Sequence, residues 1–426
     1  MKIILDNGAY TLRNMGDVAM LQAAVERMRA MVGNPELCIL TTSPELLKRY
    51  CPGTFPLTVK SRDCLFESDR PTASDLNEAW RRMMGHWRSV PLEAREFQQA
   101  LDESEAVFLC GGGFLNDINP YQTRPVLRML ADAARRGKRT GLFSQGLGPL
   151  EDPELVRLLR RTCNAGVPVA VRESLYGPEI LSRCGAGPGQ VAITGDDAIE
   201  MAWANGQAAG GNALGFSIRQ VSYSEVESRH LETIRGVMAE LRKRLGVKIV
   251  GLPVSFNTHE KDSEVLAAVT GTAVAPNATD TPERLIAAAA ECRVVVTGTY
   301  HAAVFALAQG IPCVCFYVST YYRNKLEGLA KQFPGGCVAV NLNAERATER
   351  ILNEAFRFWE SSGGDLCSRL RHSAEQQVRS ARAFYGRVMG VETKLARPEE
   401  PPEGLEQSFR SGACLDRSKR GGDGGS

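Results

Sequence analysis

Residues 294–322 read VVVTGTYHAAVFALAQGIPCVCFYVSTYY and contain no Asp, Glu, Lys or Arg. A run of this length could cross a bilayer. However, the polar and turn-forming residues 297–301 and 309–312 divide it into a β-branched run, a short helix of small residues and a second β-branched run. This order predicts a buried strand–helix–strand unit of a parallel sheet.

The same alternation of short apolar runs and amphipathic helices continues on both sides of this segment. It is typical of parallel sheets covered by helices on both faces. In the first half we expect strands at residues 3–5, 36–40, 106–110, 140–144, 167–171 and 190–193, a helix at 18–32 with Asp17 as its N-cap, and no assignment for 51–95. In the second half we expect strands at residues 213–218, 247–252, 293–296 and 313–316, with helices at 225–245, 281–292, 302–309 and 320–333.

Residues 205–212 read NGQAAGGN, a small, turn-prone sequence without periodicity that predicts an interdomain linker. The sequence therefore predicts an α/β protein of two doubly wound, Rossmann-like domains that face each other across a cleft. The N-terminal domain is expected at residues 1–204. The C-terminal domain is expected at residues 213–395, with closing helices at 344–361 and 365–388. Residues 396–426 are rich in Pro, Glu, Gly, Ser and Arg and predict a disordered tail.

The composition excludes several classes of protein. The 426 residues include 51 Lys and Arg against 49 Asp and Glu, a net charge of +2, which gives no overall attraction to nucleic acid or an anionic membrane. Twelve cysteines lie without a CxxC pair, as expected for buried apolar side chains in a reducing compartment. Cys313 and Cys315 lack further ligands nearby, so no metal is predicted. Asp6 interrupts the first apolar run too early for a signal peptide. We therefore expect a cytoplasmic protein without a transmembrane segment.

Glycine-rich and polar segments follow three expected strands of the first half. Paired α/β domains place a ligand at this end of their strands. Consecutive glycines let the backbone approach a ligand and point N–H groups at an anion, although close packing of strand on helix is the alternative. No complete GxGxxG motif with a later acidic residue is present, so NAD or FAD binding is not predicted. The segments are residues 14–17, 111–114 and 144–149, with Asn14, Gly16, Asp17, Gly112, Gly113 and Gln145 as candidate site residues.

Charged residues stand at further strand ends. Arg172 and Asp196 follow two expected strands of the first half and are either ligand contacts or an ion pair at the rim. Ser217 and Arg219 project to the same side after the strand at 213–218. The fork of an arginine there suits a carboxylate or phosphate, with an ordinary surface arginine as the alternative.

His301 begins a helix of small residues directly after a buried strand. Its place near the cleft and its titration near neutrality suit a proton-transfer role, although a histidine at a helix start is more often a capping or packing residue. Of the five histidines only His301 has this context; the others are His86, His230, His259 and His372. The helix start at residues 319–325 offers hydroxyls, N–H groups and Lys325 to a phosphate.

Taken in order, these segments resemble the polysaccharide pyruvyl transferase family. The likeness spans roughly residues 1–333 and rests on the ordered set 14–21, 111–115, 144–149, 171–173, 194–196, 217–219 and 300–325. It implies a GT-B-like fold with the acceptor on the N-terminal domain and the donor on the C-terminal domain. It also implies transfer of the carboxyvinyl group of phosphoenolpyruvate to two hydroxyls of a sugar, which forms a pyruvate ketal and releases phosphate without a bound cofactor.

The resemblance assigns roles to individual residues. His301 would protonate the vinyl carbon, Arg219 would bind the donor, and a carboxylate such as Asp17 or Asp196 would orient or deprotonate the acceptor hydroxyls. Many family members carry an arginine two residues before the histidine, where this chain has Thr299, so another cation would take its place: Arg219, Arg323 or Lys325. The expected substrate-binding residues are Asn14, Gly16, Gly112, Gly113, Gln145, Arg172, Asp196, Ser217, Tyr300, Tyr322 and Lys325.

Two other functions stay open on the sequence alone. One is a sugar-nucleotide-dependent GT-B glycosyltransferase whose diphosphate would bind at residues 111–113 and 321–325. The other is a noncatalytic glycan-binding relative that lost its donor site, as Thr299 would suggest. The expected partner is a glycan or lipid-linked saccharide, the latter reached at the inner membrane surface, and not a nucleic acid. The sequence does not define an oligomeric state.

Overall fold

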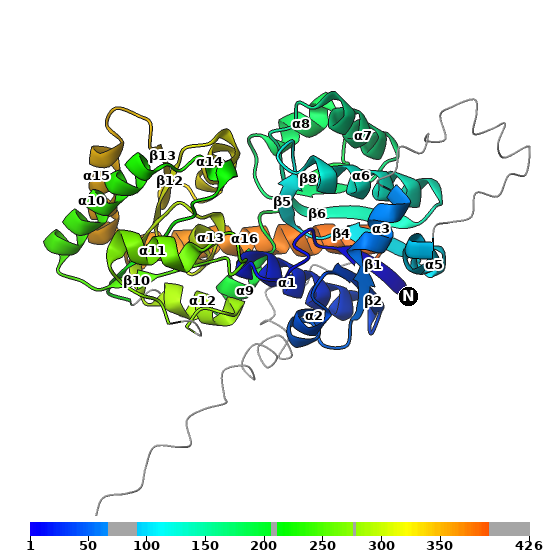
Figure 1. Cartoon of the computed structure of the whole chain (residues 1–426), viewed down its shortest axis with the longest axis horizontal. Helices are drawn as coiled ribbons and strands as arrows, with labels where there is room; N and C mark the ends of the chain where they lie inside the picture. The colour runs from blue at the N-terminus through cyan, green and yellow to red at the C-terminus, as the bar shows by residue number, and fades with distance from the viewer. Residues whose placement is uncertain (67–91, 206–210, 276–277, 392–426) are drawn as a thin grey trace, which may run out of the picture.

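The computed structural model describes residues 1–66, 92–205, 211–275 and 278–391. It contains two α/β domains, each built on a parallel sheet (Figure 1). The N-terminal sheet has the strand order β3-β2-β1-β4-β6-β7-β8, and β5 pairs with β6. Its strands are β1 (Lys2–Asp6), β2 (Glu36–Thr41), β3 (Phe55–Thr58), β4 (Ala106–Leu109), β5 (Gly112–Leu115), β6 (Arg139–Leu147), β7 (Val169–Val171) and β8 (Val191–Ile193).

The C-terminal sheet has the strand order β10-β9-β11-β12-β13. In both sheets the first strand lies inside, and the order reverses beside it. This confirms the predicted fold class of two Rossmann-like domains. The strands are β9 (Ala213–Ser217), β10 (Ile249–Gly251), β11 (Cys292–Thr297), β12 (Cys313–Tyr317) and β13 (Cys337–Asn341).

Helices cover both faces of each sheet. In the N-terminal half they are α1 (Met15–Val32), α2 (Pro44–Tyr50), α3 (Val59–Phe66), α5 (Arg95–Glu103), α6 (Pro120–Arg135), α7 (Pro153–Asn164), α8 (Gly177–Arg183) and α9 (Ala198–Asn205). In the C-terminal half they are α10 (Ser228–Leu245), α11 (Asp262–Thr270), α12 (Pro282–Ala290), α13 (Tyr300–Ala308), α14 (Thr320–Gln332), α15 (Ala347–Ser361) and α16 (Gly364–Met389).

The uncharged segment forms β11, α13 and β12, as predicted. β11 pairs in parallel with β12, with Val295 opposite Cys313. Every residue of α13 is buried, because the helix contacts α9, α12, α14 and α16 as well as its own sheet. Full burial explains why the domain can hold so long a run without a charge.

Several elements were not predicted. β3 and α3 lie in the region left unassigned, no bounds were predicted for α2 or for α5 to α9, and α11 and β13 were missed. β5 is a correction, because its glycines were expected in a loop. They pair instead with β6, which continues past its expected end, so that Gly112 lies opposite Gln145. β5 is a strand because its backbone pairs with that of β6. Glycine has a low strand propensity, so the sequence alone does not indicate this strand.

The closing helix α16 runs along both domains (Figure 1). Tyr385 stacks on Phe143 of β6 with ring centroids 3.8 Å apart. Its hydroxyl donates to Asp197 Oδ2 at 2.7 Å. The expectation that α16 belongs to the C-terminal domain is therefore corrected: its last turns pack on the N-terminal sheet. The other boundaries stay predictions, since most of the linker and the tail at 396–426 lie outside the described residues.

Ten of the eleven cysteines in the described ranges are buried, in line with their expected role as apolar side chains. No helix in these ranges has both the length and the apolar character to span a membrane.

The contact between α16 and β6 gives a stability prediction. Tyr385→Ala should lower the free energy of unfolding by about 3–5 kcal/mol, since it removes a buried aromatic ring. Tyr385→Phe should cost about 1–3 kcal/mol, since it removes only the hydrogen bond to buried Asp197. Urea unfolding measures both. Ser380→Ala, on an exposed turn of the same helix, is the control. Equal stability of Tyr385→Ala and the control would show that α16 does not anchor on this sheet.

Candidate active site

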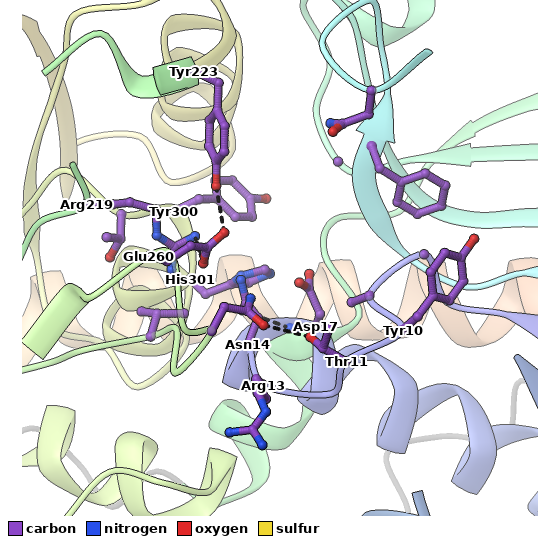
Figure 2. A pocket seen from close by; sticks show the side chains of 18 of the residues that line it. Tyr10, Thr11, Arg13, Asn14, Asp17, Arg219, Tyr223, Glu260, Tyr300 and His301 are labelled. Atoms are coloured by element: carbon purple, nitrogen blue, oxygen red, sulfur yellow. Dashed lines mark hydrogen bonds and ion pairs between the residues drawn. The ribbon is translucent and has the colours of Figure 1, made fainter. Parts of the chain in front are cut away.

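A cavity of about 680 Å³ lies between the two domains (Figure 2). Its N-terminal wall comes from the loop after β1, the start of α1, β5 and Arg172 after β7. Its C-terminal wall comes from Arg219 after β9, the loop after β10, the start of α13 and α14. Most of these segments follow the carboxyl ends of parallel strands, which is where the sequence predicted the site.

Hydrogen bonds join the two walls directly. Met15 N donates to Val254 O at 2.9 Å, and Phe256 N donates to Arg13 O at 2.7 Å. The hydroxyl of Tyr321 donates to Gly113 O at 2.8 Å. The cleft is thus bridged by contacts between main-chain and side-chain groups of both domains.

Asp196 stands behind the cavity wall and joins the two domains electrostatically. Its Oδ2 lies 3.2 Å from Arg172 Nη1 and 3.8 Å from His301 Nε2. Its Oδ1 accepts the N–H of Ala198 at 2.9 Å. Burial alone would raise the pKa of Asp196, but its interactions with His301 and Arg172 outweigh burial and lower the pKa below its usual value. Asp196 is therefore a buried carboxylate that positions two cavity residues.

Besides the Asn7 amide and Glu260 Oε2, three polar groups on the cavity lining have no hydrogen-bond partner among the described residues: Arg172 Nη2, His301 Nε2 and Tyr300 OH. Arg172 lies over the Tyr300 ring, 4.1 Å from its centroid. All three side chains are buried. Leaving a buried donor unpaired costs about 1–3 kcal/mol, so a set of three on one cavity is a candidate binding site for an anion.

Lys325 adds a further nitrogen to this set. Its Nζ contacts the Tyr321 hydroxyl, and burial together with the charges of Arg172 and Arg219 lowers its pKa well below the usual value. A Cβ placed on Gly113 would lie 2.7 Å from Lys325 Nζ and 2.8 Å from Arg172 Nη2. Gly113 therefore leaves room for both cationic groups at one point of the cavity.

Arg219 lines the cavity, but its fork is already engaged. Its Nε and Nη2 donate to Asp262 at 3.0 and 2.8 Å, and its Nη1 lies 3.4 Å from Glu260. The expectation of a fork available to the donor is therefore corrected. The acidic partners lie some forty residues away on the loop after β10 and at the start of α11, so the sequence pattern around Arg219 could not reveal them.

Asp17 projects into the cavity from the first turn of α1 (Figure 2). Burial raises its pKa, against the opposing effect of His301, Lys325 and Arg172. The N-cap of α1 is Asn14 and not Asp17: its Oδ1 accepts the N–H of Gly16 at 3.1 Å and that of Asp17 at 3.4 Å. Because Asn14 caps the helix, the Asp17 carboxyl does not serve as its N-cap.

Five expected binding residues lie behind the walls instead of on them: Gly16, Gly112, Gln145, Asp196 and Ser217. A Cβ on Gly16 would lie 1.9 Å from His301 Cγ, so this glycine permits close packing. Gln145 Nε2 donates to two main-chain carbonyls at 2.6 and 2.8 Å. Ser217 Oγ donates to Leu252 O and accepts from Thr299. These residues are placed near the site but serve its framework.

The three cationic residues expected to substitute for an arginine at position 299 lie in different environments. Lys325 lies in the cavity, Arg219 is held by carboxylates, and Arg323 lies outside it over the Tyr176 ring. Arg172, which the sequence did not select for this role, reaches the site from the opposite domain.

Tyr322, an expected binding residue, does line the cavity. His259 lines it as well, so His301 is not its only histidine. Several other lining residues were not predicted from the sequence, among them Asn7, Tyr10, Phe114, Asn119, Gln122 and Tyr223. In the described ranges no group of three or more His, Cys, Asp or Glu could hold a metal ion.

Two Rossmann-like domains with a polar site between them define a GT-B-type arrangement. The fold is similar to a putative UDP-N-acetylglucosamine 2-epimerase from Listeria monocytogenes, with a TM-score of 0.56, 13% identity and coverage of 94% of this chain and 99% of that chain. It is also similar to the UDP-GlcNAc 2-epimerase from Neisseria meningitidis, with a TM-score of 0.54, 12% identity and coverage of 91% and 99%. At these identities the likeness concerns the fold alone.

The sequence matches the polysaccharide pyruvyl transferase family over residues 14–320, and the chain belongs to this family. The match covers most of both domains and includes all the cavity motifs up to the start of α14. It confirms the resemblance found in the sequence and indicates an enzyme of this kind. A search of curated proteins gave no match.

The raised pKa of Asp17 predicts a gain in stability when its charge is removed. A folded-state pKa above the unfolded value means that the folded protein binds the proton more tightly, so stability falls as pH rises through the interval between the two values. Asp17→Asn should therefore raise the melting temperature at pH 7 and lose this advantage below pH 4. Differential scanning calorimetry at both pH values measures it. A lower melting temperature for Asp17→Asn at pH 7 would show that the carboxylate stabilises the fold.

Proposed function

We propose that this enzyme transfers the carboxyvinyl group of phosphoenolpyruvate to two hydroxyls of one sugar in a glycan, which forms a pyruvate ketal and releases phosphate. Family membership supports pyruvyl transfer to a polysaccharide. The donor is the part of the proposal that rests on the site. Phosphoenolpyruvate carries a carboxylate and a phosphate, so its site needs several cationic or hydrogen-donating groups close together.

The observation that carries the proposal is the unpartnered set on the cavity wall. Arg172 Nη2, His301 Nε2 and Tyr300 OH are buried and have no hydrogen-bond partner in the part of the chain that the structure describes, and Lys325 lies beside Arg172. A dianionic donor would supply the missing hydrogen-bond acceptors. Its charge would also favour the ammonium form of Lys325, whose pKa is held low by burial and by the neighbouring arginines.

In the proposed mechanism His301 gives a proton to the vinyl carbon of the donor, which leaves a cationic centre at the second carbon. One sugar hydroxyl attacks this carbon and forms a C–O bond. Phosphate then leaves with the electrons of its C–O bond, the second hydroxyl adds to the same carbon and closes the ketal, and the released phosphate takes up the proton of that second hydroxyl. Asp17 accepts a hydroxyl proton, and Asp196 balances the charge of the imidazolium from behind.

A sugar-nucleotide-dependent glycosyltransferase is the second candidate, favoured only by the general fold. The third, a noncatalytic glycan-binding protein, was suggested by Thr299. It loses its main support, because Arg172 and Lys325 supply cations at the site without an arginine at that position. Incubation of the protein with phosphoenolpyruvate and a glycan panel tests the choice. We expect a pyruvate ketal by mass spectrometry and stoichiometric release of phosphate. Product formation only from nucleotide sugars would refute the proposed donor.

His301 should be required for turnover and not for folding. His301→Ala should lower kcat by about 10²- to 10⁴-fold, because it removes the proton donor. The melting temperature should fall only modestly, since among the described residues the imidazole makes no hydrogen bond at Nε2, and Arg172 still pairs with Asp196 when His301 is removed. His372→Ala, on the exposed face of α16, is the matched control. Full activity of His301→Ala would exclude both the role and the mechanism.

Arg172 and Arg219 should behave in opposite ways when they are substituted. Arg172→Lys keeps the charge but loses the unpartnered Nη2, so the KM for phosphoenolpyruvate should rise about tenfold or more. Arg219→Ala leaves buried Asp262 without its partner and should cost about 3–5 kcal/mol of unfolding free energy. Steady-state kinetics and urea unfolding separate the two effects. An unchanged KM in Arg172→Lys would remove Arg172 from the donor site.

A further inference from the structure

The cavity is divided by charge. Arg172 and Lys325 lie together beside Gly113, while the rest of the N-terminal wall after β1 and around β5 is uncharged apart from Arg13 and Asp17. Figure 2 shows Tyr10 and Thr11 across the cavity from Arg219 and Tyr300, with Asp17 between the two sides. A dianionic donor gains nothing from the uncharged side, so that side is available to a second, neutral substrate. Its residues include Asn7, Tyr10, Thr42, Phe114, Asn119 and Gln122.

Asn7 is the distinctive residue of this neutral wall. It follows β1 directly and is only 1% exposed. Neither its Oδ1 nor its Nδ2 has a hydrogen-bond partner among the described residues. Buried amides in folded proteins are nearly always paired. Its neighbour Asp6, by contrast, is bound by Arg62 and by the N–H of Gly8. The amide of Asn7 therefore contributes no bond to the fold around it.

Two aromatic rings beside Asn7 are held firmly in place. The ring of Phe114 packs between two glycines: a Cβ on Gly8 would lie 1.9 Å from it and a Cβ on Gly112 2.5 Å from it. The Tyr10 hydroxyl accepts from Arg62 Nη1 at 2.9 Å. This arrangement explains why glycine occupies both positions: the glycines seat an apolar ring in the cavity wall instead of contacting an anion.

We propose that a neutral pyranose ring of the acceptor binds on this wall, with the Asn7 amide hydrogen-bonded to two adjacent hydroxyls and Phe114 against an apolar face of the sugar. An amide offers one accepting oxygen and one donating NH₂ group, which matches a pair of hydroxyls. A pyranose held here presents its remaining hydroxyls toward Asp17 and the donor. The identity of the ligand as an acceptor rests on the proposed function, whereas the binding of a neutral sugar does not.

The test uses simple glycosides and needs no turnover. The probes are the methyl glycosides of glucose, galactose and mannose, with methyl glucuronide as the charged comparison, and the readout is saturation-transfer NMR. The wild-type protein should bind at least one neutral probe more tightly than the glucuronide. Asn7→Leu, which has the same branched shape and number of heavy atoms but no hydrogen-bonding groups, should weaken that binding about tenfold or more.

Stability separates this role from a structural one. Asn7→Leu should keep or raise the melting temperature, because the amide that it removes has no partner. Asn116→Leu is the comparison. Its buried amide donates to Gly113 O at 2.8 Å and accepts from Ile118 N at 2.9 Å, so the melting temperature should fall. A lower melting temperature in Asn7→Leu with unchanged glycoside binding would assign Asn7 to the framework.

The proposal is overturned if no neutral glycoside binds the wild-type protein or if Asn7→Leu binds as well as wild type. Each outcome is separate from the fate of the donor. If Asn7→Leu forms the ketal from phosphoenolpyruvate with an unchanged acceptor KM, the sugar subsite is refuted and the proposed function is retained. Glycoside binding that depends on Asn7, without any use of phosphoenolpyruvate, would do the reverse.

Discussion

A buried carboxylate, Asp196, is the constraint on which the site depends. Its carboxylate forms an ion pair with Arg172 of the N-terminal domain and lies close to His301 of the C-terminal domain. Asp197 beside it accepts from Tyr385 of α16 and pairs with Arg27 of α1. Two adjacent carboxylates thus hold the helices that join the domains and the two groups that line the cavity. A buried charge is tolerated only when it is paired, and here the pairing also sets the geometry of the site.

The opposed charges explain how one cavity can serve two substrates. Asp262 and Glu260 neutralise Arg219, so the unpaired positive and donor groups concentrate at Arg172, Tyr300 and His301. The uncharged wall with Asn7 adjoins them at β5, where Gly113 lies against Arg172 and Lys325. We propose that the donor binds at the cationic groups and the sugar at the uncharged wall of the same cleft. This arrangement also removes the need for an arginine at Thr299, because the cation comes from the facing domain.

The sequence predicted the fold well because burial in a parallel sheet leaves strong patterns. The run at residues 294–322 gave β11, α13 and β12, and the position of His301 at the helix start followed from it. β5 was missed since two glycines carry no pattern, and its pairing is supplied by β6. The ion pair between Arg219 and Asp262 could not be predicted from the sequence, because the two residues are 43 positions apart and only the folded loop after β10 brings them together. Asn7 has no signal beyond its place after a strand; only the absence of partners in the folded structure distinguishes it.

The central claim is that solvent-derived protons reach the vinyl carbon of phosphoenolpyruvate through the site around His301. The most direct measurement is the reaction carried out in D₂O with phosphoenolpyruvate and an accepted glycan, followed by mass spectrometry of the ketal. Protonation of the vinyl carbon by an exchangeable acid predicts one deuterium in the methyl group of every ketal formed. A ketal whose methyl group contains no deuterium would contradict the mechanism.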